Sequence, residues 1–258
     1  SDVIVHPIDS EIAKNAHIDE AGYKETYLRS VEHNEEFWGE IGKRIDWIKP
    51  YTQVKDVSFN RDDLRIRWYY DGVLNVSANC IDRHLATQRD QVAVIWEGDD
   101  PTVDAHITYG QLYDNVCRFA NTLKSLGVKK GDRVVIYLPM IPEAAVAMLA
   151  CARIGAVHSV VFGGFAANEL ATRIDDARPK AVVSASCGIE PGRVVAYKPL
   201  LDAAIRAGPP ADSQTAAALV ADWDGGVRLL IDMGAEPNLD LIGNSEAPRY
   251  EYPPPRIT

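Results

Sequence analysis

The stretch RVVIYLPMIPEAAVAMLACARIGAVHSVVF, residues 133–162, decides the fold class of this chain. Its first six residues are almost continuously apolar, as in a parallel strand that is buried on both faces. Pro142 stands where the first position of a helix is expected, and Gly155 is a typical stop after a run of helix-forming residues. A second apolar run, residues 157–162, follows at once. The pattern predicts a strand, a crossover helix and a second, parallel strand.

The same alternation continues on both sides of this stretch. Upstream, VAVIWE (92–97) has the composition of a strand, and Thr108 with Gln111 three residues later forms the signature of a capping box at the start of a helix. Downstream, AANELATRIDDA (166–177) has helical spacing of its apolar residues and AVVSAS (181–186) is strand-like. Repeated alternation with short loops predicts an α/β fold with a mostly parallel sheet covered by helices.

We expect three segments that differ in composition and in the pattern of their apolar residues. Residues 1–90 form an N-terminal extension of amphipathic helices and short strands, with a turn at Asp71-Gly72. Residues 91–206 carry the βαβ units. Residues 207–258 form a divergent, partly disordered tail that is rich in Pro, Ala, Gly and Asp, within which VRLLIDMGAEPNLDLIG (227–243) has a helix–turn pattern.

Composition and charge narrow the function classes. The chain has 258 residues, a hydrophobic fraction of 47% and a formal net charge of −10. An acidic protein of ordinary hydrophobicity is not expected to bind nucleic acid or an anionic membrane, and it must bind phosphates with a few local donors. There is no secretory signal and no apolar run long enough to span a membrane, so we expect a cytoplasmic protein. The sequence leaves the oligomeric state open, a homo-oligomer included.

The cysteines and histidines do not form a metal-binding pattern. Cys80, Cys117, Cys151 and Cys187 lie far apart and include no C-x-x-C pair. We expect buried free thiols in a reducing compartment and no metal site. His84 lies on an expected short helix without a partner motif, and a structural role is expected for it.

Two loops lie where ligands collect in an open parallel sheet, beyond the carboxyl ends of the strands. FGGF, residues 162–165, follows one strand and precedes a helix, so its amide groups could bind an anion or could only form a turn. GIEPGRVVAYK (188–198) has glycines at positions 188 and 192, and Arg193 offers a guanidinium that matches a phosphate, with Lys198 as a second charge. The residues alone leave a plain turn and an anion site open in both places.

Several catalytic motifs are absent from the chain. It has no G-x-x-x-x-G-K-[ST], no G-x-G-x-x-G, no G-x-S-x-G and no H-E-x-x-H. Acidic pairs such as Asp175-Asp176 are expected to be solvated rather than paired in catalysis. We therefore assign no catalytic residue and no metal ligand.

Four consecutive blocks carry a resemblance to a known family. FWGEIGKRIDWIKPYTQVKDV (37–57), LNVSANCIDRHL (74–85), the stretch from ITYGQ to FGGF (107–165) and RIDDARPKAVVSASCGIEPGRVVAYKPLLD (173–202) resemble, in order, the AMP-forming short-chain acyl-CoA synthetases of the adenylate-forming superfamily. The resemblance runs from about Asp19 to Ala204. The family that it indicates includes acetyl-CoA and propionyl-CoA synthetases. It implies an incomplete version of the large N-terminal domain of these enzymes.

The resemblance also implies an activity. Such enzymes are acid–thiol ligases: they activate a carboxylate with Mg-ATP to an acyl-adenylate and transfer the acyl group to CoA. Their Ser/Thr- and Gly-rich phosphate loop ending in Pro-Lys-Gly, their adenine and magnesium motifs and their C-terminal catalytic lysine are absent here. We therefore expect short-chain carboxylate, CoA and ATP as the partners of the enzyme type, and no activity of this chain alone. The alternative is a non-catalytic, truncated isoform or fragment that binds CoA weakly or a partner subunit.

The part of the family's chemistry that carries over is the loop that contacts the nucleotide part of CoA. In acetyl-CoA synthetases this loop has the form Arg-x-Gly-Arg, and Glu190 here replaces its first arginine. The implied CoA-contacting residues are Phe162, Gly163, Gly164, Glu190, Pro191, Gly192 and Arg193.

Two resemblances leave alternatives open. The N-terminal blocks resemble the acetyl branch whereas SCGIEPGRVVAYKPLLD (186–202) resembles the propionyl branch, so acetate and propionate both stay open. VRLLIDMGAEPNLD (227–240) is similar to part of an ankyrin repeat, but a single copy cannot stack into a stable array. We expect the family resemblance to end near Ala207, before a tail that is genuine, alternatively spliced or frameshifted.

Overall fold

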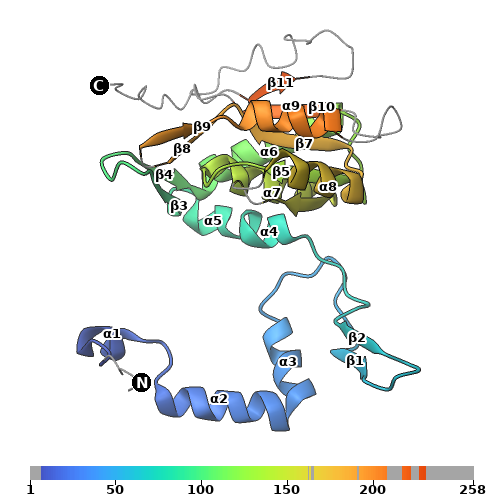
Figure 1. The fold of residues 1–258 in the computed structure, drawn as a ribbon. Helices are drawn as coiled ribbons and strands as arrows, with labels where there is room; N and C mark the ends of the chain where they lie inside the picture. The colour runs from blue at the N-terminus through green and yellow to red at the C-terminus, as the bar shows by residue number, and fades with distance from the viewer. Residues whose placement is uncertain are drawn as a thin grey trace, which may run out of the picture. The chain divides into compact units, whose positions relative to one another are not determined.

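A computed structural model describes residues 7–161, 163, 166–190, 192–207, 217–221 and 227–230 (Figure 1). The chain divides into two compact units, Ser1–Leu74 and Asn75–Thr258. The division lies earlier than the boundary at residue 90 that composition and apolar pattern suggested. The physical reason is that Asn75 belongs to the second unit, where its Nδ2 donates to the carbonyl oxygens of Ala152 and Arg153 at 3.1 Å each.

Residues 7–74 of the first unit, the part that the structure describes, form three helices and a β-hairpin. The helices are α1 (Ser10–Asn15), α2 (Glu20–Glu32) and α3 (Asn34–Gly42), and the antiparallel strands are β1 (Lys55–Ser58) and β2 (Arg65–Trp68). Helices are present here as expected, but α1 and α2 contain no buried residue, so the expected amphipathic packing is shown only in part. Strand β2 ends before the expected turn, which is closed by the amide of Gly72 donating to the carbonyl of Tyr69 at 3.0 Å.

The second unit begins with short helices and an antiparallel hairpin. The helices are α4 (Val76–Cys80), a 3-10 turn (Asp82–His84) and α5 (Leu85–Gln88), and the hairpin pairs β3 (Val92–Glu97) with β4 (Asp104–Thr108). The strand expected at 92–97 is therefore present but lies outside the parallel sheet. Its hydrogen bonds go to residues 104–108, whose strand character the sequence analysis missed.

The parallel sheet is built as the central stretch predicts. Strand β5 (Arg133–Tyr137) lies between β6 (Val157–Val160) and β7 (Ala181–Ala185), and both pairings are parallel. Helices α6 (Tyr109–Ser125), α7 (Pro142–Ile154) and α8 (Ala167–Ala177) alternate with these strands along the chain. The α/β class is confirmed for this unit.

The last described strands correct the expectation for residues 227–243. After α9 (Tyr197–Ala207), strand β10 (Ala217–Ala221) pairs parallel to β7, and β11 (Val227–Leu230) pairs antiparallel to β10. The helix–turn prediction is wrong for residues 227–230, because a short apolar run has no periodicity that separates a strand from a helix, and here the backbone of β10 provides the pairing edge. The remainder of that predicted element lies outside the described residues.

The two faces of the sheet have separate cores. Along β5, Val134 and Ile136 belong to the cluster formed with α6 and α7, whereas Val135 and Tyr137 belong to the cluster formed with α8 and α9. All four side chains are fully buried. This explains why the strand is continuously apolar, since successive side chains point to opposite faces and both faces are covered.

The helix boundaries follow local signals. The Thr108 hydroxyl accepts from the amide of Gln111 at 3.2 Å and the Gln111 side chain accepts from the amide of Thr108 at 2.9 Å, which confirms the capping box. Pro142 begins α7 as expected, and Gly155 ends it in the left-handed conformation with φ of 72°.

Candidate functional site

The candidate site lies at the carboxyl edge of the parallel strands. Strands β5, β6 and β7 end at Tyr137, Val160 and Ala185, and both loops singled out in the sequence start at this edge. The loop after β7 continues into a hairpin, β8 (Gly188–Glu190) and β9 (Arg193–Val195), which extends beyond the end of β7 (Figure 1).

The two loops meet at the side chain of Tyr197, the first residue of α9. A Cβ atom on Gly163 would lie 2.0 Å from the Tyr197 hydroxyl oxygen, and one on Gly188 would lie 2.8 Å from Cε2 of the same ring. Since real Cβ atoms do not approach other atoms this closely, a side chain at either position would force the Tyr197 ring to shift. Close backbone approach, which the glycines suggested, is therefore an approach to a tyrosine of the protein itself.

A second tyrosine lies beneath the first. The hydroxyl of Tyr137 donates to the carbonyl oxygen of Gly163 at 3.4 Å, and the rings of Tyr137 and Tyr197 have their centroids 4.8 Å apart. Burial raises the pKa of the Tyr137 phenol, with the neighbouring Tyr197 as a smaller cause, so it stays a neutral donor. The Tyr137 hydroxyl thus links Gly163 to the end of β5, and the Tyr197 ring packs beside it.

Sequence reasoning missed both tyrosines. Tyr137 is the last residue of a buried strand and Tyr197 the first of a helix, and a tyrosine at either place is not unusual. A polar-tipped aromatic at the carboxyl end of a parallel strand is the one signal that could have found Tyr137, because such strand ends border ligand sites.

The second loop forms the β8–β9 hairpin. Glu190 and Arg193 are opposite each other in the register, and Gly192 between them has φ of 76°, the left-handed conformation that glycine adopts readily. Arg193 opens β9 in an exposed position. The stretch is thus a tight hairpin whose tip carries the arginine.

Other predicted site residues have different outcomes. Phe162, Gly164 and Pro191 lie outside the described residues, and of Glu190 the backbone alone is described. Lys198 does not supply a free second charge, because its Nζ binds both carboxylate oxygens of Asp202 at 2.6 and 2.7 Å along α9. The first amides of α9 are also satisfied, since those of Tyr197 and Lys198 donate to the carbonyl of Ser186 at 3.1 and 3.2 Å.

The β3–β4 hairpin reaches the same edge through Trp96. Its indole Nε1 donates to the carbonyl oxygen of Met140, three residues after the end of β5, at 2.7 Å. The Met140 side chain is 91% exposed, which is unusual for methionine in a folded domain. Met140 therefore adds an apolar surface to the loop that follows β5.

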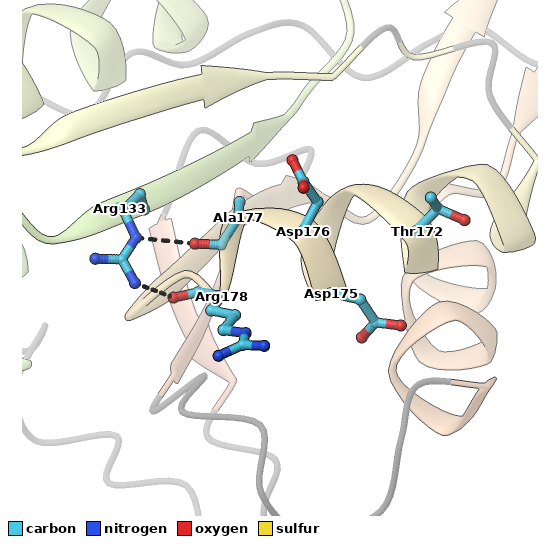
Figure 2. A pocket seen from close by; sticks show the side chains of 6 residues that line it. All are labelled: Arg133, Thr172, Asp175, Asp176, Ala177 and Arg178. Carbon is cyan, nitrogen blue, oxygen red and sulfur yellow. Dashed lines mark hydrogen bonds between the residues drawn. The ribbon is translucent and has the colours of Figure 1, made fainter.

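A hollow of about 750 Å³ lies at the opposite, amino edge of the sheet (Figure 2). Arg133, the first residue of β5, donates from Nε to the carbonyl of Ala177 at 2.9 Å and from Nη2 to that of Arg178 at 3.2 Å. Figure 2 shows Asp175 and Asp176 on α8 pointing away from this guanidinium, and both are exposed as predicted. This hollow is the capped end of α8, where a cation satisfies orphan carbonyls.

The cysteines correct one expectation. All four are free, but Cys80 is exposed, Cys117 and Cys187 are half-buried, and Cys151 alone is fully buried. Burial raises the pKa of the Cys151 thiol to about 12. Cys80 differs from expectation because it ends the five-residue helix α4 on the side away from the core.

The described residues lack two kinds of feature. They contain no group of three or more His, Cys, Asp or Glu side chains that could hold a metal ion. Among the helices described, none combines the length and apolarity needed to cross a membrane.

Comparison with protein families defines the class of protein. The family model for AMP-binding enzymes matches residues 81–254, about two thirds of the chain, so the chain belongs to the AMP-binding enzyme family. A model described as the acetyl-coenzyme A synthetase N-terminus matches residues 23–80. The first match extends past Ala207, further than the resemblance seen in the sequence blocks.

Curated relatives agree with this class. The acetyl-coenzyme A synthetase of Methylocella silvestris is 58% identical over 202 residues, which are 78% of this chain and 31% of the relative. Those of Shewanella sediminis and Yersinia pestis are 54% and 56% identical over 201 and 206 residues, covering 78% and 80% of this chain and 31% and 32% of the relatives. The chain thus spans about a third of the length of these enzymes.

Proposed function

We propose that the chain is the amino-terminal part of an AMP-forming acetate–CoA or propionate–CoA ligase. The complete reaction joins a carboxylate to ATP as acyl-adenylate with release of pyrophosphate, and then transfers the acyl group to the thiol of CoA with release of AMP. Support comes from the two adjacent family matches, which follow each other in the order of the chain, and from relatives named acetyl-coenzyme A synthetase at 54–58% identity. Those names favour acetate over propionate.

Within this ligase, the β8–β9 hairpin and the FGGF turn form the contact for the nucleotide part of CoA. The observation that carries this proposal is the meeting of Gly163 and Gly188 at Tyr197, because it makes one surface of two loops that are 25 residues apart in the sequence. Arg193 stands exposed at the tip of that surface and offers a planar fork that suits a phosphate. Glu190, opposite Arg193, leaves the site with one arginine where the resembling enzymes have two.

Replacing Arg193 with alanine is expected to weaken the binding of CoA about tenfold, the effect of losing one hydrogen bond to a charged group. Isothermal titration calorimetry with CoA measures the change. Arg118→Ala is the matched control, since it removes the same charge from an exposed position on α6, in the layer on the other face of the sheet. Equal affinities for Arg193→Ala and the unchanged chain would contradict the assignment of the hairpin.

The chain alone is expected to form no acyl-adenylate. The triphosphate of ATP needs fixed donors around its developing charge, and the sequence has no loop ending in Pro-Lys-Gly to supply them. An acetate-dependent ATP–pyrophosphate exchange assay on the purified chain is expected to show no exchange above the buffer rate. Clear exchange would mean that the chain is itself a competent ligase. Absent exchange together with CoA binding is the outcome expected both for this proposal and for the alternative role, a CoA-binding chain that associates with a full-length subunit.

The same proposal implies small-molecule partners, namely the carboxylate, ATP with magnesium, and CoA. It also implies a cytoplasmic location, where these metabolites are available.

A further inference from the structure

A second hollow, of about 640 Å³, lies at the amino edge of the sheet, away from the proposed CoA surface. Its walls are the C-terminal half of α6, the loop that leads into β5, and the last residues of α7. Because β5 and β6 begin at Arg133 and Val157, just after these walls, the hollow is at the opposite end of the strands from the β8–β9 hairpin.

The charged side chains that line this hollow are all cations. They are Lys124, Lys129, Lys130 and Arg153, and no carboxylate is among the lining residues. The three lysines are exposed, and within the described part of the chain none of them has an ion-pair partner. Arg153 is paired with Asp82, so the three lysines carry the uncompensated charge of this concavity. In a chain of net charge −10, they concentrate a local positive potential that attracts an anion.

Arg153 leaves one buried donor without an acceptor. Its Nη1 donates to Oδ1 of Asp82 at 3.2 Å and its Nη2 donates to Oδ2 of the same carboxylate, while its guanidinium carbon lies 5.0 Å from the Tyr113 ring centroid. The Nε atom is buried and has no hydrogen-bond partner among the described residues. A buried donor without an acceptor is costly, but this atom has almost no surface open to a ligand, so Arg153 acts here as a packed wall of the hollow.

The loop that carries two of the lysines is held in place. The amide of Gly131 donates to the carbonyl of Gly155 at 2.9 Å, and the Lys130 stem packs over Gly155 so closely that a Cβ there would lie 3.0 Å from its Cγ. The amide of Lys129 donates to Asp132 Oδ2 at 2.7 Å. Both lysine backbones are therefore ordered before any ligand binds, which lowers the entropy cost of binding.

The inner surface of the hollow is apolar. Ala120 and Val128 are buried, and Ile154 and Cys117 are half-buried beside them. Small-molecule sites typically combine such an apolar lining with a few polar groups that orient the ligand. A cationic rim over an apolar floor suits an organic anion better than a free inorganic ion.

We propose that this hollow binds a small phosphate monoester whose organic part is apolar. The phosphate dianion would lie among Lys124, Lys129 and Lys130, whose ammonium groups act as point charges, and the organic part would cover Ala120, Val128 and Ile154. The alternative explanation is that cations only compensate the C-terminal dipoles of α6 and α7. It accounts for Lys124 and Arg153 in the last turns of the two helices, but not for Lys129 and Lys130 in the loop.

Phenyl phosphate is the probe for the test, with benzoate, inorganic phosphate and phenol as comparison ligands. Amide ¹H–¹⁵N shifts of the ¹⁵N-labelled full chain are followed during each titration. Phenyl phosphate is expected to shift the amides of Lys129 and Lys130 saturably, and to bind more tightly than any of the three comparison ligands. Lys129→Gln combined with Lys130→Gln is expected to weaken it at least tenfold. Lys14→Gln combined with Lys43→Gln, at exposed positions of the first unit, removes the same charge and should leave the affinity unchanged.

Three outcomes would overturn the proposal: no saturable shift with phenyl phosphate, equal weakening in both double variants, or binding of inorganic phosphate as tight as that of phenyl phosphate. The last would show a phosphate site without an organic specificity. Because CoA also carries phosphates, the titration is repeated with Arg193→Ala. Unchanged phenyl phosphate binding in that variant supports a site separate from the hairpin, and lost binding would assign the shifts to the hairpin instead.

Discussion

Replacing Gly163 with alanine is expected to lower the free energy of unfolding of the second unit by about 1–3 kcal/mol, the range found when a packed site receives an extra methyl group. The reason is local: the new Cβ would lie 2.0 Å from the hydroxyl oxygen of Tyr197, which is 5% exposed and packed against Tyr137. The ring has little room to move away. Urea unfolding followed by far-UV circular dichroism measures the loss.

A double-mutant cycle separates this collision from any general effect of the substitution. In Tyr197→Phe the clashing oxygen is absent and the nearest ring atom to the new methyl is Cζ, at 3.0 Å. Gly163→Ala should therefore cost less in the Tyr197→Phe background, with a coupling energy of about 1 kcal/mol or more. Strictly additive losses would show that Tyr197 is not the reason for glycine at position 163.

Replacing Ile136 with alanine is expected to cost about 3 kcal/mol, since large-to-small changes of a fully buried isoleucine combine lost burial with a cavity. Ile136 lies in β5, is 0% exposed, and belongs to the cluster shared with α6 and α7. Urea unfolding gives the free energy, and amide hydrogen exchange in β5 confirms that the transition belongs to this unit.

Ile95→Ala is the matched control for this prediction. Ile95 is also in a strand, β3, but its side chain is 71% exposed, so its truncation should cost less than about 1 kcal/mol. Similar losses at the two positions would contradict the placement of the core on both faces of β5.

The loop at Gly163 and strand β5 each have a local sequence pattern that can be compared with its tertiary surroundings. The sequence places Gly163 in a loop after a strand, and the structure places the end of that strand, β6, at Val160 on the carboxyl edge of the sheet. What occupies the space opened by the missing side chain could not be read, because the phenol of Tyr197 comes from a helix 34 residues further along the chain. Glycine in a strand–helix loop has the same appearance whether it makes room for a ligand or for a side chain.

The charged residues of the candidate site likewise depend on contacts that only the tertiary structure shows. Both Lys198 and Arg193 are candidate cations in the sequence. In the structure Lys198 binds Asp202 within α9, and Arg193 lies in an exposed position at the start of β9. The pairing at i and i+4 is visible once the helix is known, whereas the hairpin depends on cross-strand bonds between residues 188–190 and 193–195. The cationic hollow could not be predicted from the sequence, because its residues come from three separate segments.

By itself the sequence determined the parallel sheet around β5, the start of α6 at the Thr108 capping box, and both ends of α7. Each follows from interactions within a few residues or from a periodicity that burial on one or two faces imposes. The tertiary structure alone decided that 92–97 pairs with 104–108, that 227–230 is a strand, and that Tyr197 joins the two loops of the candidate site. The physical reason is that strand pairing and side-chain contacts are satisfied by distant partners, and short apolar runs and single aromatic residues do not specify which partner they meet.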